Sequence, residues 1–308
     1  MNRTTIEWTD FTWNPVTGCH KVSPGCKNCY AETITNRFAK TWGVKSFRDV
    51  VLHEDRLSEP TKNKKKWAGK KVFVCSMSDL FQELVNDHFI WRVFQQMHFM
   101  PDTTFQILTK RLERAALFLK DWIPAPNVWI GSSVENQETA NERIPLLLQI
   151  PAAVRFLSCE PLLEPIDLGY YLRYGQSATA NDLPQLKKIH WVIAGGESGH
   201  NARPMHPDWV RSLRDQCAAA NVPFLFKQWG EWAPTDGNGP NEFAICSTGS
   251  ECTGCNDREG FHFMKKVGKS KSGNLLDGKQ HLEFPVPEIT IHIDLGFTET
   301  KPPIELGK

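Results

Sequence analysis

The 308-residue sequence has no long apolar run, almost no net charge, no internal repeat and no low-complexity tract. No segment reaches the ~20 consecutive apolar residues that span a bilayer, and residues 1–10 lack the apolar stretch of a secretory signal. We therefore expect a soluble, cytoplasmic protein with no membrane partner. Lys and Arg number 36 against 35 Asp and Glu, a formal charge of +1, which excludes a uniformly basic nucleic-acid-binding surface.

Short apolar runs alternate with amphipathic stretches between residues 70 and 230. Continuously apolar runs are typical of strands covered on both faces, and their alternation with helices predicts right-handed parallel βαβ units. We expect an α/β fold with a partial TIM-like (β/α) barrel over residues 1–230; an open doubly wound sheet is the alternative. Residues 231–308 are turn-rich and are expected to form a loop-rich C-terminal appendage. The expected strands lie within residues 71–79, 105–111, 128–136, 154–161, 190–199 and 223–230.

Each expected strand ends in polar side chains. The C-terminal ends of parallel barrel strands open on one face, so these groups are expected to converge on one site. Lys110, next to Arg111, is a candidate catalytic cation, although paired cations are also common on surfaces. Cys159 is most simply a small buried residue, but it is a candidate hydrogen-atom donor if it projects into the barrel mouth. The residues expected to bind a cofactor or substrate are Ser76, Ser78, Asp79, Ser132, Glu135, Glu160, Glu197 and Lys227.

Six of the nine cysteines form two triplets. In the first, Cys19, Cys26 and Cys29 follow a C-x6-C-x2-C pattern, and a Ser-Pro-Gly turn at residues 23–25 folds the chain back. Three thiolates suit either a tetrahedral zinc ion completed by His20 or a 4Fe–4S cluster with one iron left open. A loop before the strand–helix series lies at the barrel mouth, which favours a cluster whose open iron chelates S-adenosylmethionine.

The second triplet, Cys246, Cys252 and Cys255, follows a C-x5-C-x2-C pattern in a segment rich in Gly and Ser. His262 stands seven residues further on and is a candidate fourth ligand. A structural zinc ion on these four residues is the leading expectation. Free thiols and an auxiliary iron–sulfur cluster are the alternatives.

Several segments together carry a family resemblance: WNPVTGCHKVSPGCKNCYAE, VFVCSMSDLF, FQILTKR, NVWIGSSVENQETANERIPLL, FLSCEPLLEPIDL, GGESGHNARPMHPDWVRSLRDQC, PFLFKQWGEW and GKSKSGNLLDGKQHLEFP. They resemble the three-Cys-motif phage protein family, which has no settled function and is similar to radical S-adenosylmethionine enzymes, including DNA-repair lyases that reverse thymine photodimers. The resemblance covers about residues 5–232 and a stretch near the carboxyl end. It implies a partial TIM-like barrel, a 4Fe–4S cluster on Cys19, Cys26 and Cys29, and S-adenosylmethionine as cosubstrate.

Two features differ from the radical-enzyme pattern. Its usual spacing is C-x3-C-x2-C with an aromatic residue before the last cysteine, whereas here the first gap has six residues, Asn28 holds that place and Tyr30 follows the triplet. The Gly-Gly-Glu that grips the methionine amine normally ends the strand after the cysteine loop, but here it stands at residues 195–197. We therefore expect Glu197 at the ribose or the substrate, and the methionine end at Ser76, Ser78 and Asp79.

The leading hypothesis is an enzyme that cleaves S-adenosylmethionine with an electron from an external donor and abstracts hydrogen from its substrate. A nucleic acid or nucleotide is the expected substrate class, on the basis of the lysine-rich residues 61–71, the 11 tryptophans and the resemblance to photodimer lyases. A solvated loop is the usual interpretation of such a lysine run, and a phosphate-binding patch with Trp67 available for stacking is the alternative. The alternative is a zinc-stabilised protein that binds nucleic acid or a partner without catalysis. A barrel that binds S-adenosylmethionine without cleaving it is a third interpretation. A partner protein is also expected, since members of the resembling family are often found beside one.

Overall fold

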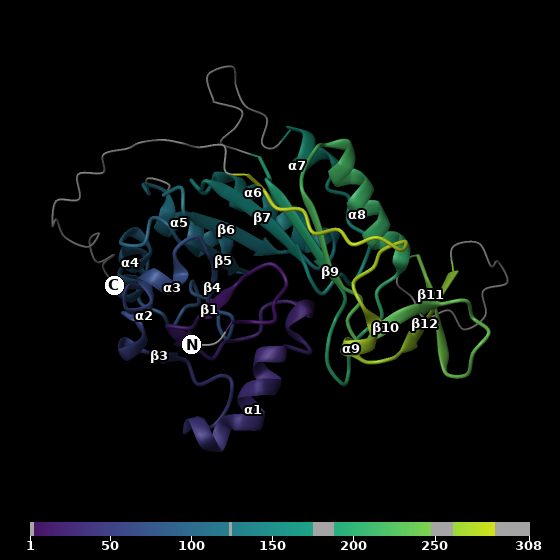
Figure 1. Ribbon diagram of the computed structural model, residues 1–308, viewed down its shortest axis with the longest axis horizontal. Coiled ribbons are helices and arrows are strands. Elements are labelled where there is room, and N and C mark those ends of the chain that lie inside the picture. Colours follow the sequence, from purple (N-terminus) through teal and green to yellow (C-terminus); the bar gives the residue numbers. More distant parts are fainter. Residues whose placement is uncertain (1–2, 123–124, 175–187, 248–260, 287–308) are drawn as a thin grey trace.

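The computed structural model describes residues 3–122, 125–174, 188–247 and 261–286. At its centre, seven strands form one sheet in which all neighbours are parallel and follow one another in chain order (Figure 1). A doubly wound sheet reverses its strand order at a switch point, so this unbroken order excludes that alternative and confirms the partial TIM-like barrel. The strands are β1 (Phe11–Trp13), β4 (Lys71–Val74), β5 (Thr104–Thr109), β6 (Val128–Ser133), β7 (Val154–Cys159), β8 (Trp191–Gly195) and β9 (Phe224–Gln228).

Amphipathic helices connect the strands and cover the outer face of the curled sheet, whereas the first long helix, α1, projects away from it (Figure 1). Helix starts follow from local capping: the Asn86 and Asn136 side chains accept hydrogen bonds from backbone amides of the first turns of α4 and α6. The helices are α1 (Tyr30–Trp42), α2 (Glu59–Lys62), α3 (Lys64–Trp67), α4 (Asp87–His98), α5 (Leu112–Leu119), α6 (Gln137–Gln149), α7 (Gly169–Tyr174), α8 (Pro207–Ala219) and α9 (Lys269–Ser272), with 3-10 turns η1 (Pro24–Cys26) and η2 (Glu54–Arg56).

Buried apolar side chains form two groups, one on each face of the sheet. Side chains alternate between the faces of a strand. In β7, Leu157 therefore joins the large core shared with the helices, whereas Phe156 joins a smaller group on the other face. Rings dominate this inner group, and the centroids of Trp8 and Phe73 are 4.6 Å apart. The aromatic rings fill the interior of the half barrel below its polar C-terminal ends. They are Trp8, Phe73, Trp129, Phe156 and Trp191.

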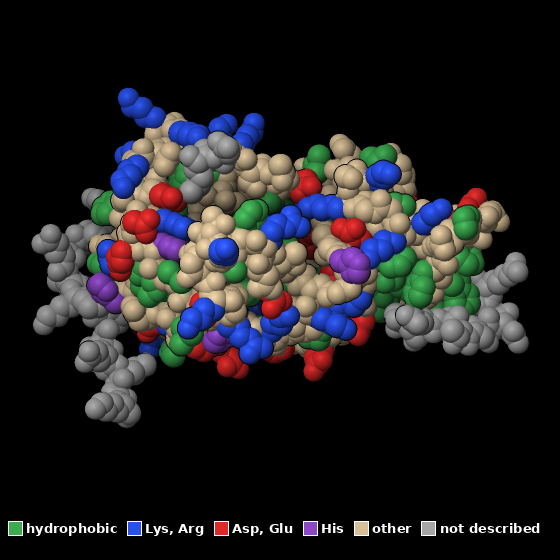
Figure 2. Space-filling model, turned by 90° about the horizontal axis from the view of Figure 1, so that it is seen from below, with side chains coloured by type: hydrophobic (Ala, Val, Ile, Leu, Met, Phe, Trp, Pro, Cys, Tyr) green, Lys and Arg blue, Asp and Glu red, His purple; other side chains and the backbone are tan. Residues whose placement is uncertain are grey.

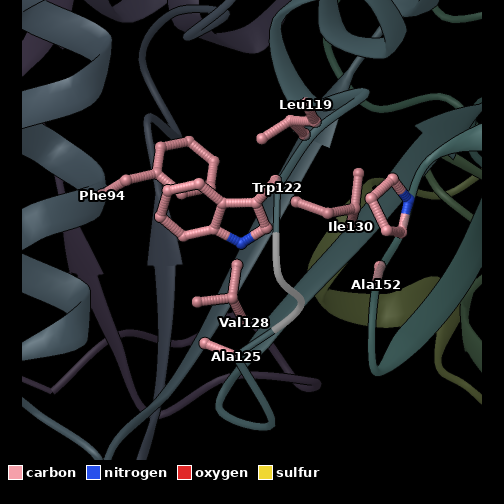
Figure 3. Close-up of a pocket in the computed structure, with 8 residues that line it drawn as sticks. Phe94, Leu119, Trp122, Ala125, Val128, Ile130 and Ala152 are labelled. Atoms are coloured by element: carbon pink, nitrogen blue, oxygen red, sulfur yellow. The ribbon is translucent and has the colours of Figure 1, made fainter. Parts of the chain in front are cut away.

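A small apolar gap lies on the helix-covered side, near the starts of β6 and β7 (Figure 3). The rings of Phe94 and Trp122 meet edge to face beside it, with centroids 4.9 Å apart. Ligand sites combine apolar walls with a few polar groups that fix orientation. Only apolar and aromatic side chains line this gap, and it lies at the end of the strands opposite their polar tips, so we interpret it as a packing feature.

The lysine-rich segment 61–71 forms short helices and the start of β4. Trp67 is fully buried there and stacks on Phe11, with ring centroids 5.9 Å apart. The expectation that Trp67 offers a stacking surface for a base is therefore wrong, because its indole is needed in the core.

The C-terminal part contains a three-stranded antiparallel sheet in the order β10-β12-β11. Ile245 and Met264 on one face of this sheet belong to the main core, so the sheet packs against the barrel. Further along, Leu282 pairs with Leu225 of β9, and this returning chain covers the free edge of the large sheet. The strands are β10 (Trp232–Thr235), β11 (Glu242–Cys246) and β12 (Phe261–Lys266), and a separate pair is formed by β2 (Val16–Thr17) and β3 (Val51–Leu52).

Candidate functional site

The first cysteine loop follows β1 and β2 and lies at the C-terminal ends of the parallel strands. Gly18 begins it with a φ of +83°, and a Cβ atom at this position would lie 2.2 Å from the Asp49 carbonyl oxygen, so only glycine fits. The Gly18 carbonyl accepts hydrogen bonds from Ser78 Oγ at 2.5 Å and Gln82 Nε2 at 3.0 Å. The segment after β4 thus fixes the start of the loop.

The middle of the loop rests on the end of β6. Ser23 Oγ donates to Glu135 Oε1 at 2.8 Å and lies 3.6 Å from Cys26 Sγ. A Cβ atom at Gly25 would lie 2.5 Å from the Glu135 side chain, so the backbone touches this carboxylate directly. The turn residues of the Ser-Pro-Gly segment therefore allow the close approach that positions Cys26.

The three thiols of this loop are free, partly buried and electrostatically coupled through Cys26. Burial raises the pKa of Cys19 to about 11, against a lowering by Arg111, and it raises the pKa of Cys29 as well. For Cys26, burial favours the neutral thiol, but Lys110 and hydrogen bonds from Val22 and Ser23 hold the pKa below its usual value. Of the three thiols, Cys26 thus has surroundings that favour the thiolate, whereas burial favours the neutral form of Cys19 and Cys29.

The spacing of the three sulfurs bears on whether the loop suits a tetrahedral zinc ion or a 4Fe–4S cluster. Zn–S bonds of about 2.3 Å in a tetrahedron place ligand sulfurs about 3.8 Å apart. Among the residues that the structure describes, one group of three ligand-type side chains has all its donor atoms within 4.8 Å, and Cys19, Cys26 and Cys29 do not belong to it. At least two of the three sulfurs therefore lie more than 4.8 Å apart in the described structure, a separation closer to that of the cysteine ligands of a multi-iron cluster than to that of the ligands of a single zinc ion.

Two cations from the end of β5 bind the loop. Arg111 Nη1 lies 3.8 Å from Cys19 Sγ and 3.1 Å from Asp79 Oδ2, while Nη2 donates to the His20 carbonyl at 3.1 Å. Lys110 Nζ donates to Ser23 Oγ at 3.1 Å and pairs with Glu135. These positive charges offset negative charge on thiolates, and they explain why adjacent cations follow this strand.

Two carboxylates at the strand ends are held by cations rather than exposed. Glu135 is fully buried, and its second oxygen accepts from Arg143 at 3.0 Å. Glu197, after β8, binds Arg203 and accepts from Asn28 Nδ2 at 3.0 Å. Burial would raise both pKa values, but the paired cations hold the pKa of each carboxyl below its usual value. Both groups are ionised and position the loop.

A further polar cluster lies beside the loop, at the ends of β7, β8 and β9. Lys227 Nζ donates to both oxygens of Glu160, at 2.8 and 2.9 Å. Gln228 Nε2 donates to Glu160 Oε1 at 3.2 Å and to Ser198 Oγ at 3.1 Å. Gln228 is 5% exposed, and no described residue donates to its Oε1. This buried acceptor is available to a bound polar molecule.

Not every predicted residue reaches the mouth. In β6, alternation places Ser132 on the same face as Ile130, toward the helices. Cys159 is fully buried in the helix-covered core beside Cys217, and burial raises its thiol pKa well above the usual value. The structure therefore does not bring Ser132 and Cys159 to the other candidates.

Ser76, Ser78 and Asp79, which were expected to bind the methionine end of S-adenosylmethionine, instead make hydrogen bonds that hold the cysteine loop and its neighbours in place. Ser76 Oγ donates to Asn14 Oδ1 at 3.1 Å, and the Ser76 carbonyl accepts from the Tyr30 hydroxyl. Asp79 accepts from Thr109 Oγ1 at 2.8 Å and from Arg111. Sequence reasoning missed the partner residues that hold these groups and the loop, and all of them except Gln82 lie within the resembling segments. They are Asn14, Ser23, Asn28, Gln82, Arg143 and Arg203.

The structure does not bring the candidate ligands of the second triplet together in the described residues. Cys252 and Cys255 lie outside the described residues. Cys246 pairs with Phe261 and Ile245 pairs with His262, so alternation turns Cys246 and His262 to opposite faces of the sheet. In the described structure His262 instead lies 3.2 Å from Asp208.

These features define a half barrel of parallel strands with a three-cysteine loop at its C-terminal mouth. Residues 3–285 match the model of a family described as a protein of unknown function (DUF5131), and the chain belongs to that family. No curated protein matches the sequence.

Two solved structures are similar. One is spore photoproduct lyase complexed with dinucleoside spore photoproduct, at 13% identity and a TM-score of 0.40, covering 86% of this chain and 72% of that one. The other is a point mutant of spore photoproduct lyase, at 12% identity and a TM-score of 0.41, with the same coverage. No helix among the described residues is long and apolar enough to cross a membrane.

Proposed function

We propose that this protein is a radical S-adenosylmethionine enzyme whose 4Fe–4S cluster is held by Cys19, Cys26 and Cys29. The observation that carries the proposal is the placement of three free thiols on one loop at the mouth of a half barrel, beside two cations. The resemblance to the three-Cys-motif phage family and its radical-enzyme relatives agrees with this assignment. When bound, such a cluster supplies one electron, received from an external low-potential donor, for cleavage of S-adenosylmethionine to methionine and a 5′-deoxyadenosyl radical that abstracts hydrogen.

The surrounding residues would position the loop and compensate its charge. Arg111 and Lys110 bring positive charge to Cys19 and Cys26, while Ser78 and Glu135 fix the backbone that carries the thiols. These groups act through the ligands and are positioning residues.

The polar cluster of Glu160, Lys227 and Gln228 supplies the groups for a polar cosubstrate. A carboxylate accepts hydrogen bonds from ribose hydroxyls or an amine, an ammonium binds a carboxylate, and the Gln228 Oε1 accepts one further hydrogen bond. Because these side chains lie at the same strand ends as the loop, we assign them to S-adenosylmethionine or the substrate.

The substrate class that we propose is a nucleic acid, and the observation that favours it is the exposed face of α1. Tyr30, Ile34, Phe38 and Trp42 recur every four residues, are 36–48% exposed, and form one apolar stripe directly after the cysteine loop. The Phe38 and Trp42 rings stack with centroids 5.5 Å apart. Exposed aromatic rings are platforms for stacking bases.

Charge around α1 matches this ligand. Residues 20–48 include six exposed Lys and Arg residues but a single acidic residue, Glu32, which pairs with Lys21. Figure 2 views the side from which α1 projects, and Lys and Arg side chains are spread over the middle of that face. A local excess of positive charge in a nearly neutral protein suits a phosphate backbone.

Anaerobic reconstitution with iron and sulfide tests the cluster. We expect a brown protein that holds four iron atoms and releases 5′-deoxyadenosine when given S-adenosylmethionine and a reductant, and we expect Cys26→Ala to abolish both. Stoichiometric zinc without iron would instead establish the zinc-stabilised binding protein. A cluster that releases no 5′-deoxyadenosine would establish a barrel that binds S-adenosylmethionine without cleaving it.

Nucleic-acid binding is tested separately, by fluorescence anisotropy of a labelled single-stranded oligonucleotide. Removing a stacked ring costs ~1–3 kcal/mol per base, so Trp42→Ala should weaken binding about 5- to 150-fold. Phe99→Ala is the matched control, because Phe99 is 51% exposed at the end of α4. Equal affinities for the two variants, or no binding by the wild type, would reject the nucleic-acid assignment while leaving the cluster in place.

A further inference from the structure

Three ligand-type side chains converge between α8 and the C-terminal sheet, away from the cysteine loop. His206 caps the start of α8, Asp208 is its second residue, and His262 lies on β12. His262 Nε2 lies 3.2 Å from Asp208 Oδ2, and His206 Nδ1 lies 3.9 Å from the same oxygen. All three donor atoms lie within 4.8 Å of one another, and no other described group of three does so.

The fold brings these residues together from distant parts of the chain. Ile245 and Met264, on the same face of the C-terminal sheet as His262, are buried in the main core, so this face is turned toward the barrel. The imidazole rings of His206 and His262 lie edge to face, with centroids 4.8 Å apart. A ligand set drawn from both elements would join the sheet to the helix.

We propose that His206, Asp208 and His262 bind one divalent transition-metal ion. Two imidazoles and one carboxylate form a donor set for such ions, and ligand distances of about 2.0–2.2 Å require donor atoms a little over 3 Å apart. The Asp208–His262 distance already meets this requirement, and His206 Nδ1, at 3.9 Å from the same Asp208 oxygen, would have to move closer on ligation.

The surroundings suit the ion. Arg211 Nη1 donates to Asp208 Oδ1 at 2.8 Å, which leaves Oδ2 directed at the two histidines. His206 is fully buried, whereas the side chains of Asp208 and His262 are 48% and 31% exposed, so the ion would keep an open coordination position toward solvent. His206 Nδ1 also accepts from the Asp208 amide at 3.1 Å, and ligation through this nitrogen would replace that bond.

This assignment differs from a zinc site on the second triplet. Cys246 lies on the opposite face of the sheet from His262, so the two do not share an ion in the described arrangement. His262 shares the proposed ion with His206 and Asp208 at the start of α8 instead, so the ion is bound by nitrogen and oxygen atoms and not by sulfur.

The test uses the full-length chain with Cys19, Cys26 and Cys29 replaced by Ala, so that the first loop cannot bind the probe. Zn²⁺ binding is measured by calorimetry, and Co²⁺ serves as a spectroscopic probe. We expect one equivalent of Zn²⁺, a Co²⁺ spectrum without thiolate charge-transfer bands, and a higher melting temperature with metal. Replacing even residues that only support metal ligands weakens binding about 10- to 100-fold, so His262→Gln and Asp208→Asn should each weaken it at least tenfold.

Matched variants give outcomes that decide the question. Cys246→Ser, and the double change Cys252→Ser with Cys255→Ser, should leave Zn²⁺ affinity within about twofold of the parent if the site has no sulfur ligand. Loss of binding in the cysteine variants together with retention in His262→Gln would overturn the proposal in favour of a thiolate site. Zn²⁺ bound well below one equivalent in the parent chain would overturn it as well. His206 is left unchanged, because it is buried and caps a helix.

Discussion

The two cysteine triplets have similar spacings in the sequence, and the surroundings of the first can be compared with those of Cys246, the described member of the second. The first is seated on the ends of four strands: Ser78, Lys110, Glu135 and Glu197, or residues bonded to them, all contact its loop. In the second, Cys246 lies on the outward face of a peripheral sheet, turned away from His262. Among the described residues, the first loop thus has a supporting shell of side chains from the strand ends, whereas Cys246 does not share a face with the histidine expected to complete its site.

The largest expected effect comes from removing a thiol from each region. Cys26→Ala should abolish cluster assembly, because three thiolates are the minimum set for a cluster with one open iron. Cys246→Ser should leave iron content unchanged. Iron and sulfide analysis of both variants after anaerobic reconstitution measures the contrast, and an equal loss of iron would erase the difference between the triplets.

The buried support of the first loop is the next target. Glu135→Gln leaves Lys110 and Arg143 without their carboxylate in a site where Glu135 is fully buried, and uncompensated buried charge costs about 3–5 kcal/mol. Urea unfolding should show a loss of this size. Glu164→Gln, at an exposed glutamate, should change the free energy of unfolding by less than about 0.5 kcal/mol. Similar losses in the free energy of unfolding for the two variants would mean that the ion pairs of Glu135 with Lys110 and Arg143 do not stabilise the fold.

A smaller effect is expected from the close approach of the loop to β6. The added methyl group of Gly25→Ala would lie 2.5 Å from Glu135, so the loop must shift, at a cost of about 1–3 kcal/mol. We expect partial iron occupancy at limiting iron. Gly169→Ala, where the nearest atom is 3.1 Å away on the Asp167 side chain, serves as the control and should assemble the full cluster. Full occupancy in Gly25→Ala would show that the loop seats without this contact.

The smallest effect concerns an exposed attachment of the C-terminal part. Asp277 binds Arg211 and Arg214 on α8, each at 2.7 Å. Hydrogen bonding to Arg211 lowers the Asp277 pKa from 3.8 to about 2. A carboxyl whose pKa is depressed on folding stabilises the fold above its unfolded pKa, and this contribution is lost as pH falls from about 4 toward 2. Asp277→Asn, which tolerates the positive φ at this position, should lower stability at pH 7 by less than about 1 kcal/mol, with a smaller difference from wild type at pH 2, where the folded-state carboxyl is about half ionised. Unfolding curves at the two pH values measure this.

The sequence was sufficient to predict the parallel strands, because strands covered on both faces are continuously apolar. The same property hid which face each side chain occupies. Ser132 was expected at the mouth, and Cys159 was a candidate hydrogen-atom donor if it projected there, whereas both side chains point toward the helices. The three residues of β1 were too few to stand out in the sequence.

Cysteine spacing and position predicted where the first loop lies, but not what holds it. Ser78 and Asp79 were expected to bind a ligand, whereas in the structure they bind Gly18 and Arg111. Such pairings join residues separated by 30 to 60 positions, and only the folded chain determines them. The His206–Asp208–His262 group was missed for the same reason, since 54 residues separate Asp208 from His262.

Among the described strands, β1 and β9 end the large sheet and share no ladder, and the rings of Trp8, Trp191 and Phe284 pack across the interior instead. A complete eight-stranded wall admits a ligand only from above. In this half barrel the first and last strands are not joined by a ladder, and aromatic side chains rather than a further strand close the interior. Because side chains fill the interior below, the proposed nucleic-acid substrate would approach the cysteine loop from the polar C-terminal ends of the strands.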